Sequence, residues 1–124
     1  MKTINIDDQN WAQAPGYLKN LLLAADDLHC EGARVQIVSM KPKATIDNHY
    51  HATSHEFYYV LQGECRVIIN GEVHFLKRGN MLLIEPGDVH RLVNDGEEEF
   101  RLLVFKTNST LDDTHWTDRE SFVG

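Results

Sequence analysis

Three histidines and one glutamate stand at spacings that suit a site for a single metal ion. His49 and His51 are separated by one residue, Glu56 follows after a short interval, and His90 lies much further along the chain. Alternate residues of a β-strand point to the same face, so His49 and His51 would both aim into the interior of a small barrel. Neutral imidazole suits iron, nickel, copper and zinc, and an added carboxylate extends the choice toward manganese.

Neighbouring side chains leave alternatives open for this site. Asp47 shares the strand parity of His49, although the chain is still entering the strand there. His55 has the opposite parity to Glu56 and would take its place if the strand slipped by one residue. Asp88, two residues before His90, either orients that histidine or shapes the turn, and the turn is the commoner role for aspartate.

Three more polar or aromatic residues have two interpretations each. Tyr58 shares the parity of Glu56 and belongs either to the core or to the wall of a pocket. Gln36 and Arg101 lie in segments where polar and apolar side chains alternate, so each either lines a pocket or faces the solvent.

The elements that position these residues read as short strands. From residue 33 onward, β-branched and aromatic runs alternate with turns that contain Gly or Asn. The strongest hairpin joins its two strands through Asn70-Gly71, which supplies the two positive φ angles of a type I′ turn. Strands are expected over residues 33–40, 57–61, 65–69, 72–77, 81–84, 89–93 and 100–105. This rhythm predicts an all-β sandwich or double-sheet barrel and excludes helical repeats and βαβ units.

The two ends of the chain give weaker signals. Leu18, Leu21 and Leu22 fit a helical stripe, but their segment is short and lacks strong caps, so residues 17–25 stay ambiguous. Residues 26–32 are expected to form a loop. We therefore expect an N-terminal arm or edge segment over residues 1–32, a barrel over 33–106, and a tail over 107–124 that packs on the barrel through Trp116.

Size and charge limit the partners. A chain of 124 residues predicts one domain, and its net charge of −7 with scattered Lys and Arg excludes nucleic acid. No apolar run suits a membrane span or a signal peptide, so we expect no membrane partner and a cytoplasmic protein. Cys30 and Cys65 form no metal or redox motif and are taken as ordinary small residues.

Two short motifs contain the candidate residues at fixed offsets. They comprise His49-Tyr50-His51, Glu56 and Gly63, and then Gly79, Pro86-Gly87, His90 and Asn94. The glycines stand where strands must turn with positive φ, and Asn94 is interpreted in the same way because Asn tolerates the left-handed region.

With these motifs the chain resembles the cupins, in particular the compact single-domain cupins of prokaryotes, over roughly residues 33–105. Two positions depart from the family pattern. Lys43 stands where a glycine usually opens the first motif, and Glu85 stands at a usual proline. The resemblance implies an all-β double-stranded β-helix, or jelly-roll barrel, of two antiparallel sheets.

The resemblance also implies the site and its use. It assigns His49, His51, Glu56 and His90 as ligands of one divalent transition metal ion, with Fe, Mn, Ni, Zn, Co and Cu not distinguished. The expected partner is a small oxygen-rich metabolite of the sugar or carboxylate type, handled by a metal-dependent isomerase, dioxygenase or lyase. The alternatives are a non-catalytic sensor and a metal site that only stabilises the fold. A homodimer is also implied, with Trp11 and Trp116 available as apolar anchors.

Overall fold

Two antiparallel sheets form the protein in the computed structural model, which describes residues 1–8 and 11–118. The elements are η1 (Ile6–Asp8), β1 (Ala12–Ala14), β2 (Tyr17–Leu23), α1 (Ala25–Leu28), β3 (Arg34–Met40), β4 (Thr45–Tyr50), β5 (His55–Gln62), β6 (Glu64–Ile69), β7 (Glu72–Lys77), β8 (Met81–Ile84), β9 (His90–Val93), β10 (Phe100–Thr107) and β11 (His115–Trp116). No helix among the described residues is long and apolar enough to cross a membrane.

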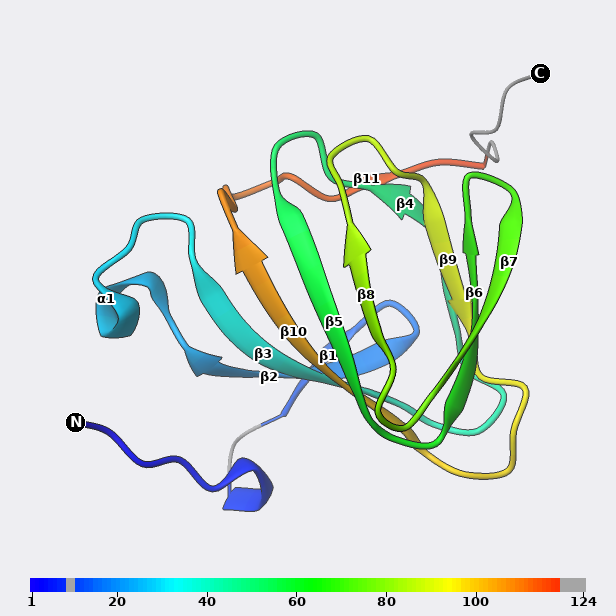
Figure 1. Cartoon of the computed structure of the whole chain (residues 1–124), viewed down its shortest axis with the longest axis horizontal. Coiled ribbons are helices and arrows are strands. Elements are labelled where there is room, and N and C mark those ends of the chain that lie inside the picture. The colour runs from blue at the N-terminus through cyan, green and yellow to red at the C-terminus, as the bar shows by residue number, and fades with distance from the viewer. Residues whose placement is uncertain (9–10, 119–124) are drawn as a thin grey trace.

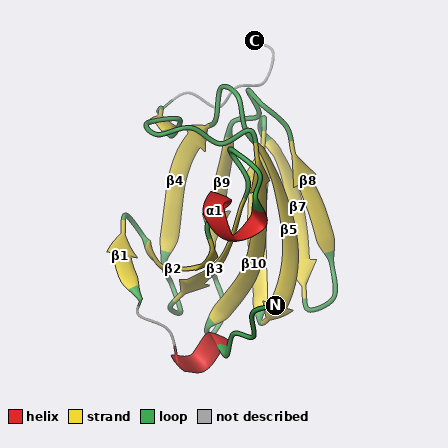
Figure 2. Ribbon diagram, turned by 90° about the vertical axis from the view of Figure 1, so that its left-hand side faces the viewer, coloured by secondary structure: helices red, strands yellow, loops and turns green. Residues whose placement is uncertain are grey.

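The strand order is that of a barrel built from two layers. The six-stranded sheet runs β1-β2-β3-β10-β5-β8 and the five-stranded sheet runs β11-β4-β9-β6-β7. The two sheets face each other, and α1 projects from the end of the barrel where β2 passes to β3 (Figures 1 and 2). The predicted all-β jelly-roll barrel is confirmed, and each strand expected after residue 33 is present.

Strand alternation decides which side chains enter the core. In β5 the buried and exposed residues alternate, so Glu56, Tyr58 and Val60 point inward while Phe57 and Tyr59 point outward. The same alternation places Phe100, Leu102 and Val104 of β10 inside, each at most 1% exposed. The inner face is therefore apolar along most of each strand and becomes polar only toward the end that carries Glu56.

The N-terminal segment adds strands at the edge of the six-stranded sheet, and it differs from the sequence-based expectation at residues 26–32. The ambiguous residues form strand β2, which pairs with β3, and the short helix α1 lies where a loop was expected. The stripe of Leu18, Leu21 and Leu22 does not become a helix. Pairing with the free edge of β3 satisfies the backbone groups of β2 over most of its length, and this long-range ladder outweighs a short local pattern.

The turns confirm the glycine interpretation and correct the one for Asn94. Gly63, Gly79 and Gly87 have φ of +77°, +89° and +88°. Asn94 is not among the described residues with positive φ; instead it is 1% exposed, and its Nδ2 donates to the carbonyls of Met40, Lys41 and Glu98 at 3.2, 3.1 and 2.9 Å. Asn94 therefore ties together the chain segments that enter β4 and leave β9, a task that requires amide donors rather than a special φ.

Lys43, which replaces the usual opening glycine, adopts the left-handed conformation itself, with φ of +70°. Its Nζ reaches across to the Asp95 carbonyl at 2.7 Å and to Glu97 Oε1 at 3.0 Å. The turn has thus kept the backbone shape of a glycine turn while gaining a side chain that bonds the neighbouring loop.

Candidate metal centre

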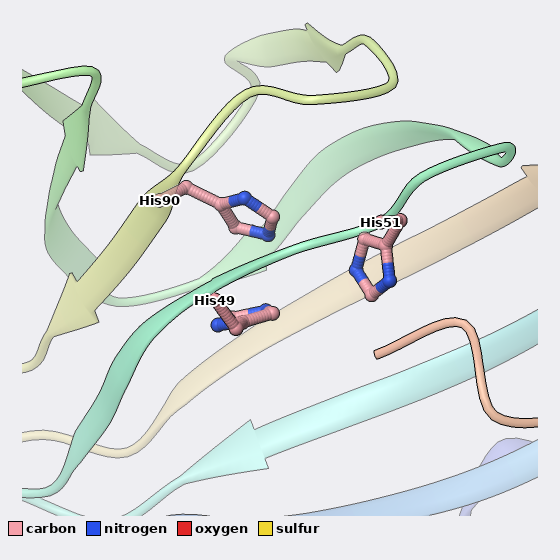
Figure 3. A group of neighbouring side chains, drawn as sticks. All are labelled: His49, His51 and His90. Atoms are coloured by element: carbon pink, nitrogen blue, oxygen red, sulfur yellow. The ribbon is translucent and has the colours of Figure 1, made fainter. Parts of the chain in front are cut away.

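Three buried histidines meet at one end of the barrel interior. His49 lies near the end of β4, His51 follows that strand directly, and His90 opens β9 beside it. One ring nitrogen of each lies within 4.8 Å of the others, a spacing that could hold a metal ion (Figure 3). His49 and His90 are direct cross-strand partners, with ring centroids 4.1 Å apart. The predicted parity of His49 and His51 is correct, because both line the same cavity.

Each imidazole is oriented by a main-chain carbonyl. The Nδ1 atoms of His49, His51 and His90 lie 2.7, 3.0 and 2.9 Å from the carbonyl oxygens of Asp47, Asp113 and Asp88. A carbonyl only accepts, so these contacts place the proton of each neutral ring on Nδ1. The Nε2 lone pairs are then left for the interior, which is the usual arrangement of histidines that bind a metal.

Glu56 completes a group of atoms that have no conventional partner. Its Oε1 lies 2.6 Å from His51 Nε2 and 3.4 Å from His90 Nε2. All three atoms are buried and form no hydrogen bond of acceptable geometry with the described residues. Atoms that present lone pairs to one another at these distances require a shared cation, either a proton or a metal ion. The donor set, three imidazoles and a carboxylate, fits a divalent transition metal.

The electrostatics keep these groups in the form that binds a cation. Burial, with a contribution from His90, lowers the pKa of His49 to about 3, so this ring stays neutral at ordinary pH. Burial alone would raise the pKa of Glu56, but hydrogen bonds from His51 and His90, which form when the shared cation is a proton on Nε2, outweigh it together with the charge of Lys106 and hold the pKa well below its usual range. The site therefore offers a neutral imidazole and an ionised carboxylate.

A cavity of about 40 Å³ adjoins these residues. Apolar side chains of both sheets form most of its wall, including Val38, Leu92 and Leu102. Lys106 is the cation of the wall, with its Nζ 3.6 Å from Glu56 Oε2. A cavity of this size accommodates about two or three water molecules, so it admits only a small ligand as it stands.

Tyr58, Gln36 and Arg101, which each had two interpretations, have defined positions in the structure. Tyr58 belongs to the core and also lines the cavity, and Gln36, which is buried, lines it as well. Arg101 lies outside the cavity, over the Trp11 ring at 5.3 Å and near Asp7. Burial first, and then the charge of Glu56, raises the pKa of Tyr58 well above its usual range, so its hydroxyl stays protonated.

His55, Asp88 and Trp116 have different surroundings in the structure. His55 is exposed on the outer face of β5, whereas Glu56 is buried on the inner face beside the histidines. The side chain of Asp88 accepts from the Glu85 amide at 2.9 Å, which confirms its turn role, while its carbonyl orients His90. The Trp116 ring lies 5.0 Å from that of His49.

Two residues near the site, Lys106 and Asp113, were not predicted from the sequence. Lys106 continues the inward parity of Leu102 and Val104 along β10, so alternation alone would have placed it in the interior. Asp113 carries no local signal.

Asp113 supports the site from the tail through both its main chain and its side chain. Besides orienting His51, it accepts bonds from the amides of Ala52, Thr53 and Ser54 at 2.8, 3.1 and 3.1 Å and from Thr53 Oγ1 at 2.9 Å. Burial acts to raise the pKa of Asp113, but these bonds prevail and lower it to about 2.

Known proteins resemble this chain in both sequence and fold. A profile of the cupin domain matches residues 36–106. The polyketide synthase protein CurC of Streptomyces cyaneus is 39% identical over 64 residues, which are 52% of this chain and 42% of that protein. The chain likewise covers less than half of two further Streptomyces relatives.

Solved structures share the fold at low identity. The polyketide cyclase RemF of Streptomyces resistomycificus superposes with a TM-score of 0.80 at 19% identity, over 96% of this chain and 87% of that one. A predicted oxalate decarboxylase of Thermotoga maritima gives a TM-score of 0.79 at 20% identity, over 86% of this chain and 98% of that one. The profile match covers more than half of the chain, and the structures share its barrel, so this protein belongs to the cupin domain family.

Proposed function

We propose that this protein holds one divalent transition metal ion through His49, His51, Glu56 and His90, and that it is an enzyme acting on a small carboxylate or similar oxygen-rich metabolite. The observation that supports the proposal most strongly is the convergence of three buried atoms without hydrogen-bond partners, the Nε2 atoms of His51 and His90 and Oε1 of Glu56. The similarity in fold to a predicted oxalate decarboxylase and to a polyketide cyclase is compatible with a ligand rich in oxygen.

The charge of the site favours an anion. A divalent ion with neutral histidines, one carboxylate from Glu56 and one ammonium from Lys106 leaves a net charge of about +2. Lys106 is only 14% exposed and reaches Glu56 Oε2 at 3.6 Å, so its ammonium is held at the cavity wall. A ligand carboxylate next to Lys106 would neutralise this charge.

The surrounding residues would orient the ligand and keep water out. When bound, the metal ion would act as a Lewis acid toward a ligand oxygen. The hydroxyls of Tyr17 and Tyr58 stay protonated, because burial first and the charge of Glu56 second raise the pKa of both, so they can donate hydrogen bonds to ligand oxygens. The apolar wall of Val38, Leu102 and Val104 strengthens such bonds by excluding water.

Metal analysis tests the site. Protein purified without chelators or a histidine tag should contain about one equivalent of a transition metal, and His51→Ala, His90→Ala and Glu56→Gln should each lower this at least about tenfold. The matched control is His74→Ala, because His74 lies on β7 with 41% of its side chain exposed. If His51→Ala and His90→Ala keep full metal content, the assignment is wrong, and a protonated pair of His51 and Glu56 explains the contact.

Turnover separates the proposed enzyme from the two alternatives. The metal-loaded protein is incubated with a mixture of small carboxylates and sugar acids and followed by NMR. An enzyme consumes one of them, a sensor broadens or shifts the signals of one without consuming it, and a structural metal site does neither while losing thermal stability on chelation. The second or third pattern refutes the catalytic part of the proposal.

We also propose that the protein is a homodimer and that the outer face of the six-stranded sheet forms its interface. Five large apolar side chains on β5, β8 and β10 are at least 37% exposed and lie opposite one another across the strands: Phe57, Tyr59, Met81, Leu83 and Phe105. Together they expose on the order of 500 Å², most of the roughly 800 Å² that each partner of a stable complex buries. Of the anchors expected from the sequence, Trp11 lies under Arg101, whereas Trp116 lies over His49 and is still 47% exposed.

A further inference from the structure

Trp116 stands between two separate spaces. On one side is the small metal cavity, which the tail closes with Thr114 and Trp116. On the other side is an open surface groove of about 810 Å³, which Asp47, Arg91 and Trp116 help to line. Among the described residues, Trp116 alone lines both spaces. Its indole ring is therefore the wall that separates them.

The ring covers a metal-site histidine directly. Its centroid lies 5.0 Å from that of His49, at an angle of 42° between the planes. His49 itself is only 7% exposed, while Trp116 is 47% exposed. The outer face of the indole thus meets solvent and its inner face shields His49, so the histidine would become accessible if the ring were absent or displaced.

The segment that carries the ring is anchored by Asp113 and continues as a short edge strand. Asp113 holds the tail through its side-chain bonds to the amides of Ala52, Thr53 and Ser54. Beyond it, the two residues of β11 pair with Tyr50 and His49, the Thr117 amide donates to the Asn48 carbonyl at 3.0 Å, and the His115 ring stacks on Tyr50 with centroids 5.0 Å apart. β11 is a two-residue strand at the edge of its sheet, and such a strand separates at a lower cost in free energy than a long central strand.

We infer that Trp116 sets the size of the ligand that reaches the metal cavity, a role that rests on the metal site proposed above. With the ring in place, the cavity of about 40 Å³ accepts only the smallest carboxylates. A ligand with a longer chain fits only when the ring moves aside, and its remainder then lies in the groove beside Asp47 and Arg91. Trp116 is thus a specificity-determining residue that acts by excluding ligands.

The wall is tested first in the metal-free protein, by the rate at which diethyl pyrocarbonate modifies each histidine, followed by mass spectrometry. Trp116→Ala should raise the rate at His49 at least about tenfold and leave the rate at His90, which is 0% exposed, unchanged. Trp116→Phe should keep the rate at His49 within about threefold, because an aromatic ring remains over it. An unchanged rate at His49 in Trp116→Ala overturns the inference.

The size limit is tested in protein loaded with Co²⁺, by titration with formate, acetate, propionate, butyrate and hexanoate and by the visible absorption of the ion. In the unmodified protein, affinity should fall at least about tenfold from acetate to butyrate, and in Trp116→Ala this fall should shrink to about twofold or less. The same fall in both proteins overturns the inference.

The two experiments also separate this inference from the metal proposal. If the unmodified protein binds no Co²⁺, the proposed function fails, while the modification rate at His49 still decides whether the ring is the wall. If Trp116→Ala loosens the whole barrel, so that His90 is modified as well, Trp116→Leu serves in its place, because it keeps apolar packing on β4 and removes only the ring.

Discussion

Replacing Asp113 by Asn is expected to destabilise the protein through a carboxylate that lies outside the barrel strands. The pKa of Asp113 falls from 3.8 to about 2 on folding because three amides and one hydroxyl donate to it. This difference corresponds to about 2.5 kcal/mol of stability at pH 7. An asparagine keeps one acceptor oxygen and turns an NH₂ group toward the remaining donors, so Asp113→Asn should lose about 2–3 kcal/mol.

The sign of the pH dependence follows from the depressed pKa. The contribution of Asp113 is fully present above pH 3.8, the unfolded value, and disappears as the pH falls through about 2. At pH 3 about half of it should remain, so the gap between Asp113→Asn and the unmodified protein should shrink to about half of its value at pH 7.

Urea unfolding of the metal-free protein with a chelator present measures this effect. A loss of about 2.5 kcal/mol should lower the midpoint by about 1.5 M at pH 7 for a chain of this length. Asp112→Asn is the matched control, because Asp112 is the exposed neighbour and should shift the midpoint little. A gap below about 0.5 kcal/mol at pH 7, or a gap of equal size at pH 3 and pH 7, would refute the reasoning.

Three further predictions concern turns, protonation and assembly. Gly63→Ala should lower the free energy of unfolding by about 3 kcal/mol, because φ is +77° and the new Cβ would lie 2.6 Å from the Glu99 carbonyl oxygen. Gly79→Ala, at φ of +89° with no atom within 4 Å of the new Cβ, should lower it by only about 1 kcal/mol. Equal urea midpoints for the two variants would contradict this prediction. The ring signals of His49 in the metal-free protein should not shift between pH 8 and pH 5, because its pKa is about 3, and an NMR midpoint near 6.5 would show that burial does not control it. Light scattering should give twice the mass of one chain, and Leu83→Lys on the six-stranded sheet should halve that mass. The control Val73→Lys, at a residue of β7 that is exposed to a similar degree, should leave the mass unchanged. If the unmodified protein is a monomer, the dimer proposal is wrong.

The barrel strands could be predicted because their signals are local. Alternation within a strand and a Gly or Asn turn at its end are present in any short window, and they located β3 and β5 to β10. Strand β2 could not be assigned, because its leucines also fit a helical stripe and only the edge of β3 decides between the two.

The structure brings together the metal-site residues proposed from the motifs. Most of the residues that hold them in place could not be predicted from the sequence. Asp113 acts on residues about 60 positions away and lies in a polar tail without any pattern. The motif predicts the position of Asn94 but the wrong role for it. Asparagine is favoured both where its amide bonds the carbonyls of neighbouring segments and where the backbone is left-handed, and the structure shows the first. Lys106 is the exception, because the alternation of inward and outward side chains along β10 predicts that it points into the barrel.

The direct pairing of His49 with His90 has a consequence for how the barrel folds. A slip of one residue between β4 and β9 would turn His49 outward and bring Asn48 to the interior. An ion that requires both imidazoles would bind only chains in the native register, so its binding free energy would stabilise the native register relative to the misaligned ones. Metal added during refolding would then select the correct strand alignment, and the site would contribute to the fidelity of folding as well as to chemistry.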